Sequence, residues 1–113
     1  MEIKYKIWIE KDGKVVFGKG RDEILTAVQD MRSLTAAARK LNMSYRAAWG
    51  RLKASEERTG VKFVAVNSTE KGMHLTPQAQ AIIDRFAQLE EEVKSLLAKA
   101  SLDFRRLIDK KGK

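Results

Sequence analysis

The sequence predicts a mainly helical α+β fold, and the order of its hydrophobic patterns is the observation that predicts it. Apolar and basic residues alternate with a period of two over residues 3–9, which indicates a strand with one buried face. A second β-favouring run, three segments with helical spacing, a second pair of short strands and one long helical pattern follow. Three helices followed by a β-hairpin is the order of a winged helix-turn-helix. We therefore expect that fold, with an N-terminal β-hairpin before it and a long C-terminal dimerisation helix after it.

The first hairpin turns at Asp12-Gly13, because an Asp-Gly step between two β-favouring runs is a strong hairpin signal. The second strand covers residues 15–17, and Gly18 and Gly20 are expected to end it. A helix follows from Arg21, and its apolar residues fall on one face. These residues are Ile24, Leu25, Val28 and Met31.

Two further short helices come next. One covers about residues 34–41, and either Ser33 or Thr35 is suited to cap it. The other begins at Ser44, runs over about residues 44–58 and is stopped by Gly60. Residues 61–66 then predict a strand, residues 67–72 a turn and residues 73–75 a short return strand.

The last helix opens at Thr76-Pro77, with Thr as the cap and Pro at the first helical position. Its apolar residues recur at alternating spacings of four and three, which is a heptad seam. The seam could pack on its own domain, but its length favours a partner helix. The residues that we expect to carry dimerisation are Ile82, Phe86, Leu89, Val93 and Leu96.

The seam breaks at Asp103, and Phe104, Leu107 and Ile108 form a shifted apolar stripe. The path of the chain after Ala100 stays open at this point, since the helix could continue or fold back. We expect two parts: residues 1–75 as the winged helix-turn-helix with its hairpin, and residues 76–113 as the dimerisation helix with a basic tail.

Composition narrows the classes of function. Lys and Arg number 23 against 15 Asp and Glu, so the net charge of +8 attracts polyanions, nucleic acid first and acidic membranes second. No cysteine and a single histidine, His74, exclude disulfides and Cys or multi-His metal sites. No apolar run approaches the ~20 residues of a membrane span, and the start lacks a secretory signal. We expect a cytoplasmic protein with no cofactor, and His74 is expected to be structural.

Residues 33–52 are the informative segment, and they lie within a stretch, residues 31–55, that contains six basic residues and no acidic one. Ala37 and Ala38 are small enough for two helices to cross closely, and Asn42 tolerates the left-handed backbone that the turn between them requires. Ser44 caps the second helix, whose N-terminal part enters the major groove in a helix-turn-helix. The candidate DNA-binding residues are Thr35, Arg39, Lys40, Ser44, Tyr45, Arg46, Gly50, Arg51, Lys53 and Lys71.

These candidates have different roles. Arg46 is placed to make a bidentate contact with a guanine, worth roughly 1–3 kcal/mol of discrimination. Ser44 and Tyr45 can donate to phosphate or to a base edge. The other basic residues of the two helices would contact phosphates, and Lys71, between the wing strands, would reach a phosphate or the minor groove. Trp49 is interpreted as a packing residue.

Residues 33–44, Ser-Leu-Thr-Ala-Ala-Ala-Arg-Lys-Leu-Asn-Met-Ser, resemble the first half of the helix-turn-helix in LysR-type regulators. Residues 43–49, Met-Ser-Tyr-Arg-Ala-Ala-Trp, resemble the N-terminal DNA-binding domain of the ModE family, which are molybdate-responsive bacterial transcription regulators. The segment 71–76, Lys-Gly-Met-His-Leu-Thr, is similar to the end of that family's wing. The resemblance covers roughly residues 5–95.

The resemblance implies a winged-helix homodimer that binds a palindromic operator, with the flanking strand and the long helix making much of the dimer contact. Full-length ModE members continue into molybdate-binding domains, whereas this chain ends at Lys113. We therefore do not expect molybdate sensing, and a separate sensor protein is a possible partner. The wing also has only Gly72 where some members have several glycines.

Taken together, the sequence predicts a bacterial, sequence-specific DNA-binding transcription regulator that acts as a homodimer. Its two recognition helices would enter successive major grooves about 34 Å apart. The alternative is a protein-interaction or adapter winged helix that recruits a sensor through the long helix. An enzyme is not expected, since the chain has no convincing acid pair, no partner for its histidine and no Gly-rich phosphate loop.

Overall fold

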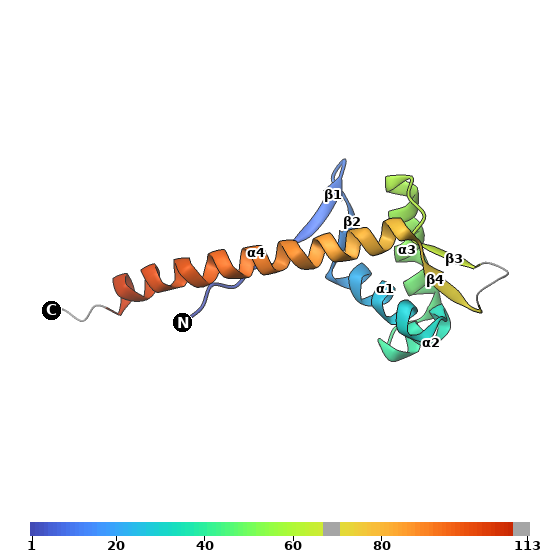
Figure 1. Cartoon of the computed structure of the whole chain (residues 1–113), viewed down its shortest axis with the longest axis horizontal. Coiled ribbons are helices and arrows are strands. Elements are labelled where there is room, and N and C mark those ends of the chain that lie inside the picture. Colours follow the sequence, from blue (N-terminus) through green and yellow to red (C-terminus); the bar gives the residue numbers. More distant parts are fainter. Residues whose placement is uncertain (67–70, 110–113) are drawn as a thin grey trace. The chain divides into compact units, whose positions relative to one another are not determined.

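The computed structural model describes residues 1–66 and 71–109. Its elements follow the predicted order of two strands, three helices, a second hairpin and one long helix (Figure 1). They are β1 (Trp8–Lys11), β2 (Lys14–Gly18), α1 (Lys19–Met31), α2 (Leu34–Lys40), α3 (Tyr45–Thr59), β3 (Val64–Val66), β4 (Met73–Leu75) and α4 (Pro77–Ile108). The winged helix-turn-helix fold with a long C-terminal helix is confirmed.

The chain divides into two compact units, which we describe separately. One unit is Ile7–Ile83 and contains the helix-turn-helix and both hairpins. The other joins residues 1–6 to α4 from Asp84 onward. Within the described residues, no helix has the length and apolar character needed to cross a membrane.

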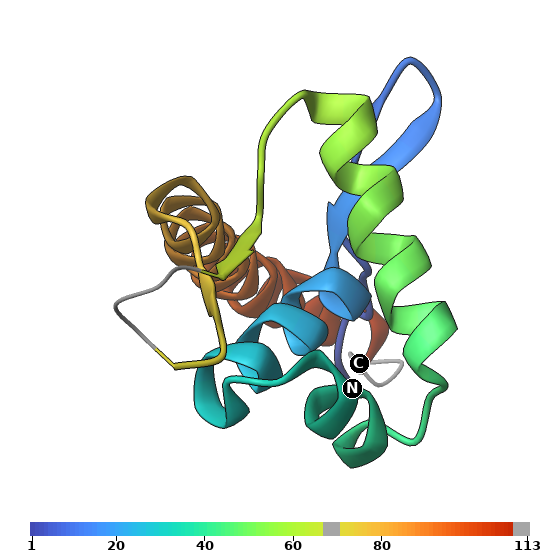
Figure 2. The same cartoon turned by 90° about the vertical axis from the view of Figure 1, so that its right-hand side faces the viewer.

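The core of the Ile7–Ile83 unit lies where α1, α2 and α3 meet (Figure 2). Ala37 and Ala38 on α2 are buried, as the close crossing of two helices requires. Ala48 and Leu52 form the buried face of α3 and have no exposed surface. Further buried side chains of this core come from the first hairpin, α1, the start of α2, the segment around the start of β3 and the start of α4: Val16, Phe17, Ile24, Leu25, Ala27, Val28, Leu34, Phe63, Val64 and Ala79.

The helix ends follow the predicted capping chemistry. Ser33 Oγ accepts a hydrogen bond from the N–H of Ala36 at 3.1 Å, so Ser33 rather than Thr35 is the cap of α2. Ser44 Oγ does the same for Ala47 at 3.0 Å and starts α3. Asn42 has a φ of 57° in the turn, and Gly60 ends α3 with a φ of 75°. Of these positions, Asn42 and Ser44 lie between the two helices and shape the turn by which α3 leaves α2.

The N-terminal strand is shorter than predicted. Only Trp8–Lys11 pairs, antiparallel to β2 and with a register shift between Ile9 and Glu10, and all four residues of β1 are exposed. The predicted buried face is therefore wrong, because α1 and α3 pack against β2 and leave β1 as the outer strand of the hairpin. Ile3 and Tyr5 instead lie in the other unit, where they line a depression with Leu97 and Ala98 of α4.

The first helix begins two residues earlier than predicted. Gly18 is the last residue of β2, and Gly20 lies in the first turn of α1. A Cβ on Gly18 would come 3.0 Å from the Cβ of Trp8, so this glycine allows the two strands of the hairpin to approach closely.

The first wing strand is also shorter than the predicted 61–66. The carboxylate of Glu56, a residue only 7% exposed, accepts hydrogen bonds from the N–H groups of Phe63 at 2.7 Å and Val64 at 3.4 Å. Thr76 donates its hydroxyl to the carbonyl of Lys62 at 2.6 Å. The backbone before β3 is thus held largely by side chains, together with one backbone hydrogen bond from the N–H of Thr76 to the carbonyl of Phe63 at 3.0 Å. Thr76 Oγ also accepts from the N–H of Ala79 and caps α4 as predicted.

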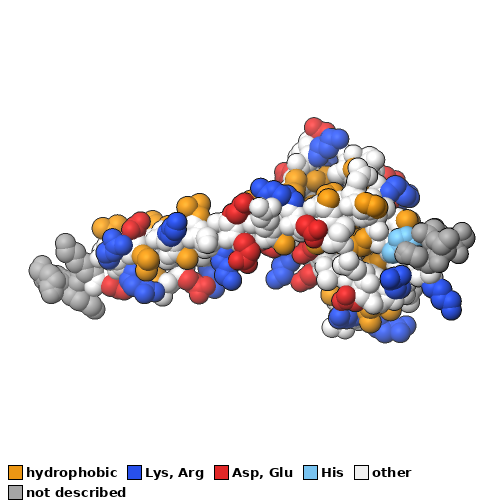
Figure 3. All heavy atoms as spheres, viewed as in Figure 1, with side chains coloured by type: hydrophobic (Ala, Val, Ile, Leu, Met, Phe, Trp, Pro, Cys, Tyr) orange, Lys and Arg blue, Asp and Glu red, His pale blue; other side chains and the backbone are white. Residues whose placement is uncertain are grey.

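In the other unit, α4 continues as one helix to Ile108, so the chain extends beyond Ala100 rather than folding back. Hydrophobic side chains are visible along its surface (Figure 3). The most exposed are Leu96, Leu107 and Ile108, each at least 64% exposed. Two surface ion pairs lie on this helix, Arg85 with Glu92 and Arg106 with Asp103. They contribute little to stability because solvent screens them.

Replacing Glu56 by alanine should lower the free energy of unfolding by about 2–3 kcal/mol, because the buried N–H groups of Phe63 and Val64 lose their acceptor. Urea denaturation followed by circular dichroism measures this loss. Glu57→Ala is the matched control, since Glu57 is exposed on the same helix and its loss should cost no more than about 0.5 kcal/mol. Equal stabilities of the two variants would contradict the role given to Glu56.

Candidate nucleic-acid interface

The outer face of α3 is the centre of the candidate interface. Ser44, Tyr45, Arg46, Gly50 and Arg51 are all exposed, while Ala48 and Leu52 turn inward. The first turn of α3 contains no acidic residue. The positive end of the helix dipole is therefore not offset there and adds to the charge of Arg46. This end of the helix is suited to receive an anion or the acceptor edge of a base.

All ten sequence-predicted DNA-binding residues are exposed. Thr35, Arg39 and Lys40 lie on α2, Lys53 lies two turns after Tyr45 on α3, and Lys71 lies just before β4. The structure thus leaves each of them accessible, and their contacts with DNA remain proposals. The rest of the predicted wing turn, residues 67–70, lies outside the described residues.

Lys40 has a setting that the sequence did not reveal. It lines a depression with Asp22, Glu23 and Asp30 of α1, because α1 packs against α2. These carboxylates reduce the local positive potential at Lys40, so it should attract phosphate less than Arg39 does. The run of residues without acids in the sequence is therefore not fully matched by an acid-free surface.

Two arginines that the sequence analysis did not single out tie the hairpin and α1 to α3. Arg21 Nε donates to Ser55 Oγ, which is fully buried, at 2.8 Å, and Arg58 Nη1 donates to the carbonyl of Val15 at 2.6 Å. Burial lowers the pKa of Arg21, and the nearby charges of Arg58 and Arg51 lower it further. These bonds hold α3 against the rest of its unit. A serine on the inner face of a helix, as Ser55 is after Ala48 and Leu52, was the available signal for such a bond.

The wing is fixed at its second strand by a close backbone contact. Met73 donates its N–H to the carbonyl of Arg32 at 2.9 Å, and Arg32 itself is left-handed, with a φ of 56°. Gly72 has a φ of 78°, and a Cβ at this position would overlap the Arg32 carbonyl oxygen. Glycine is thus required here on two counts, and it sets the direction in which Lys71 leaves the wing. Gly72, the single glycine of the predicted wing, is therefore the residue that allows the close contact with the Arg32 carbonyl.

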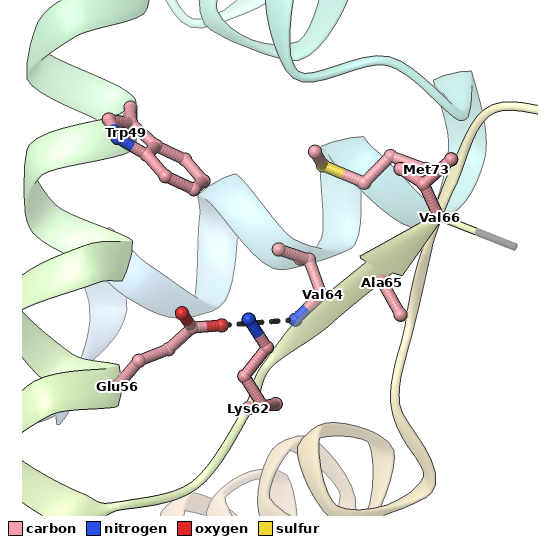
Figure 4. Close-up of a pocket in the computed structure, with 7 residues that line it drawn as sticks. All are labelled: Trp49, Glu56, Lys62, Val64, Ala65, Val66 and Met73. Atoms are coloured by element: carbon pink, nitrogen blue, oxygen red, sulfur yellow. Dashed lines mark hydrogen bonds between the residues drawn. The ribbon is translucent and has the colours of Figure 1, made fainter.

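Between α3 and the wing lies an open depression of about 320 Å³ (Figure 4). Trp49 forms its wall on the helix, Val64, Val66 and Met73 form its wall on the wing, and Glu56 with Lys62 closes its lower end. Lys53 Nζ lies 5.7 Å from the centre of the Trp49 ring. Trp49 is 36% exposed, so it is only partly the packing residue that the sequence indicated.

One protein-family model matches the part of the chain that contains this candidate interface. The family model for the bacterial regulatory helix-turn-helix proteins of the lysR family matches residues 23–80, which include α2, α3 and the wing. No relative was found among curated protein sequences.

Solved structures with the same fold include two DNA-binding domains in complex with DNA and the protein ArgP. The crystal structure of the CbnR DNA-binding domain in complex with DNA shares 24% identity over 79% of this chain and 94% of that one, with a TM-score of 0.52. The BenM DNA-binding domain with benA site 1 DNA shares 20% identity over 72% and 89% of the two chains, with a TM-score of 0.55. ArgP from Mycobacterium tuberculosis shares 25% identity over 74% of this chain, with a TM-score of 0.53. This chain spans only 30% of the ArgP chain.

Replacing Gly72 by alanine should destabilise the protein more than replacing Gly13 by alanine. Both glycines have a φ of 78°, so both variants incur the roughly 1–2 kcal/mol of a left-handed alanine. Only Gly72 faces an overlap, because no atom lies within 4 Å of a Cβ at Gly13. Urea denaturation of the two variants measures the difference. An equal loss would show that the Arg32 contact does not constrain the wing.

Proposed function

The chain belongs to the bacterial lysR family of helix-turn-helix regulatory proteins, and from this premise we propose that it binds a palindromic operator as a homodimer and reads it with α3. It is a DNA-binding transcription regulator rather than an enzyme, as the sequence analysis expected. The observation that carries the proposal is the outer face of α3, where Ser44, Tyr45 and Arg46 are exposed at the N-terminal end of a helix without an acid in its first turn.

In this proposal the exposed residues divide into two classes. Arg46 enters the major groove and donates both guanidinium arms to a guanine, while Ser44 and Tyr45 bond to a base edge or a phosphate. Arg39, Arg51, Lys53 and Lys71 bind phosphates, and Lys40 contributes less because of its carboxylate neighbours. Thr35 and Gly50 lie on the exposed surfaces of α2 and α3, and Gly50, which has no side chain, allows the DNA backbone to approach closely.

The long helix supplies the dimer contact. Phe86 is already buried in the single chain, while Ile82, Leu89 and Val93 are half-buried and Leu96 is exposed. A second copy would cover the accessible part of this seam and place two recognition helices about 34 Å apart. We therefore keep the division into a DNA-binding part, residues 1–75, and a dimerisation helix, residues 76–113, as part of the proposal.

The finer family assignment is not supported by the comparisons. The matched model is that of the lysR family, so the ModE-like character of residues 43–49 stays a prediction. A separate sensor protein and a cytoplasmic location also belong to the proposal and rest on the sequence analysis alone.

Selection from random duplexes at about 150 mM salt tests the reading of sequence by Arg46. We expect a palindrome to be enriched, and Arg46→Ala to lose preference at one position in each half-site, by roughly 1–3 kcal/mol. Arg39→Ala is the matched control, because losing a phosphate contact should weaken binding to all sequences alike. Selection without any enriched site would contradict the proposal and leave only non-specific attraction to polyanions.

Replacing Leu96 by glutamate should weaken dimerisation by at least about 100-fold, because a leucine that the dimer would bury on each copy is exchanged for a charge. Sedimentation equilibrium measures the dissociation constant. Leu102→Glu is the control, since Leu102 is 52% exposed on the same helix but lies outside the seam. A wild-type protein that stays monomeric would favour the adapter alternative, in which the long helix recruits a different protein.

A further inference from the structure

The contacts of the proposed function do not use the depression between α3 and the wing. Its position next to them suggests a role in binding. Tyr45, Trp49 and Lys53 follow each other at intervals of four residues, so they form one stripe along α3. The stripe begins at the end of the helix proposed to enter the major groove. Trp49 then borders the depression on one side, and Val66 and Met73 of the wing border it on the other.

The indole of Trp49 extends from α3 toward the wing (Figure 4). Among the described residues its Nε1–H donates no hydrogen bond, and Lys53 Nζ lies 5.7 Å from the ring centre. The indole therefore offers an accessible apolar face and an unused donor. Lys53 stands beside it, and Lys62 stands at the lower end of the depression.

DNA geometry identifies what would meet this surface. The major groove is about 12 Å wide and the minor groove about 6 Å, and a single sugar-phosphate strand separates them. A protein with α3 in one groove and the wing beside the next must pass over that strand. Its surface there meets deoxyribose carbons and phosphate oxygens, which match an apolar wall flanked by two ammonium groups.

We propose that the depression seats the DNA backbone strand between the two grooves, with the Trp49 indole against a deoxyribose and its Nε1–H donating to the adjoining phosphate. The inference rests on the proposed function, which places α3 in the major groove. Lys53 and Lys62 bind the phosphates on either side. Trp49 is thus a DNA-binding residue that adds affinity without reading sequence.

The charge of the surroundings favours DNA over a second copy of the chain. Glu56 is the one acidic residue lining the depression within the described residues, and its carboxylate is occupied by the N–H groups of Phe63 and Val64. The flanking charges are both lysines. An anionic polymer satisfies this arrangement, whereas a second copy would bring its own lysines against the first.

Fluorescence of Trp49 tests the proposal directly. The chain has two tryptophans, so Trp8→Phe leaves Trp49 as the sole reporter. Adding a mixed-sequence 24-base-pair duplex at about 50 mM salt should reduce acrylamide quenching of Trp49 at least about twofold, because the strand covers its exposed face. The matched control is Trp49→Phe, in which Trp8 on β1 reports and its quenching should not change. Equal changes in both proteins would overturn the proposal.

Affinity provides the second measurement. Trp49→Ala should weaken binding by more than about tenfold, because it loses the apolar ring as well as a hydrogen bond to a charged group that alone is worth about tenfold, and the factor should be the same for the selected operator and for random duplexes. The affinity of Trp49→Phe should lie between those of the wild type and Trp49→Ala, since this variant keeps an apolar ring but lacks the N–H. Thermal unfolding of each variant checks that the fold is retained, which the partial exposure of Trp49 favours.

The outcomes separate this inference from the function on which it rests. If the protein binds duplexes but Trp49 stays equally accessible to acrylamide, the seat for the backbone is disproved while the regulator function stands. If Trp49 becomes protected as protein concentration rises without DNA, a second copy covers the depression and the inference is also disproved. If no duplex is bound even at low salt, both the inference and the proposed function fail.

Discussion

The buried carboxylate of Glu56 is the interaction on which the geometry of the interface depends. It lies on α3, the helix proposed to enter DNA, and it accepts the N–H groups at the start of the wing. Recognition helix and wing are therefore joined by charge-assisted hydrogen bonds, which are stronger than neutral ones. The second wing strand is fixed independently, by the bond from Met73 to the carbonyl of Arg32 at the end of α1. Because each strand has its own anchor, the distance between the two DNA-facing elements is set before any DNA is bound.

Sequence patterns predicted the elements that depend on local signals. Ser44 as a cap, Asn42 in the turn, Gly60 as a stop and Thr76 at the start of α4 are all chemical preferences expressed within a few residues, and each was confirmed, while the structure chose Ser33 over Thr35 as the cap of α2. The alternation over residues 3–9 misled because a period of two does not say whether a covering layer exists. Here the pairing partner of the segment ends at Gly18, and residues 3–7 form no strand. Tertiary context decided the outcome, and a sequence pattern does not contain it.

The candidate site shows the same limit from another side. That Arg46, Tyr45 and Arg51 are exposed follows from helical phase and was predictable. The role of Glu56 was not, since a glutamate near the end of an amphipathic helix is more often solvated, and only the fold brings Phe63 against it. Likewise Lys40 lies in a stretch without acids along the sequence but close to three acids in space. The charges along the sequence predict that the interface is positive. The three-dimensional arrangement of the charges decides which basic residues contribute to it.

The apolar surface of α4 gives the strongest reason to expect a partner. Leu96, Phe104 and Leu107 are 64%, 50% and 74% exposed in the single chain, and the last two follow the predicted break at Asp103. From Leu96 the spacing runs four, four and three, through Ala100 and Phe104 to Leu107. This lengthens the period from 3.5 toward 3.67 residues per turn, which unwinds a supercoil but keeps the stripe on one face of a straighter helix. The apparent break is therefore a continuation of the seam, and a partner helix that covers Leu96 would also reach Leu107.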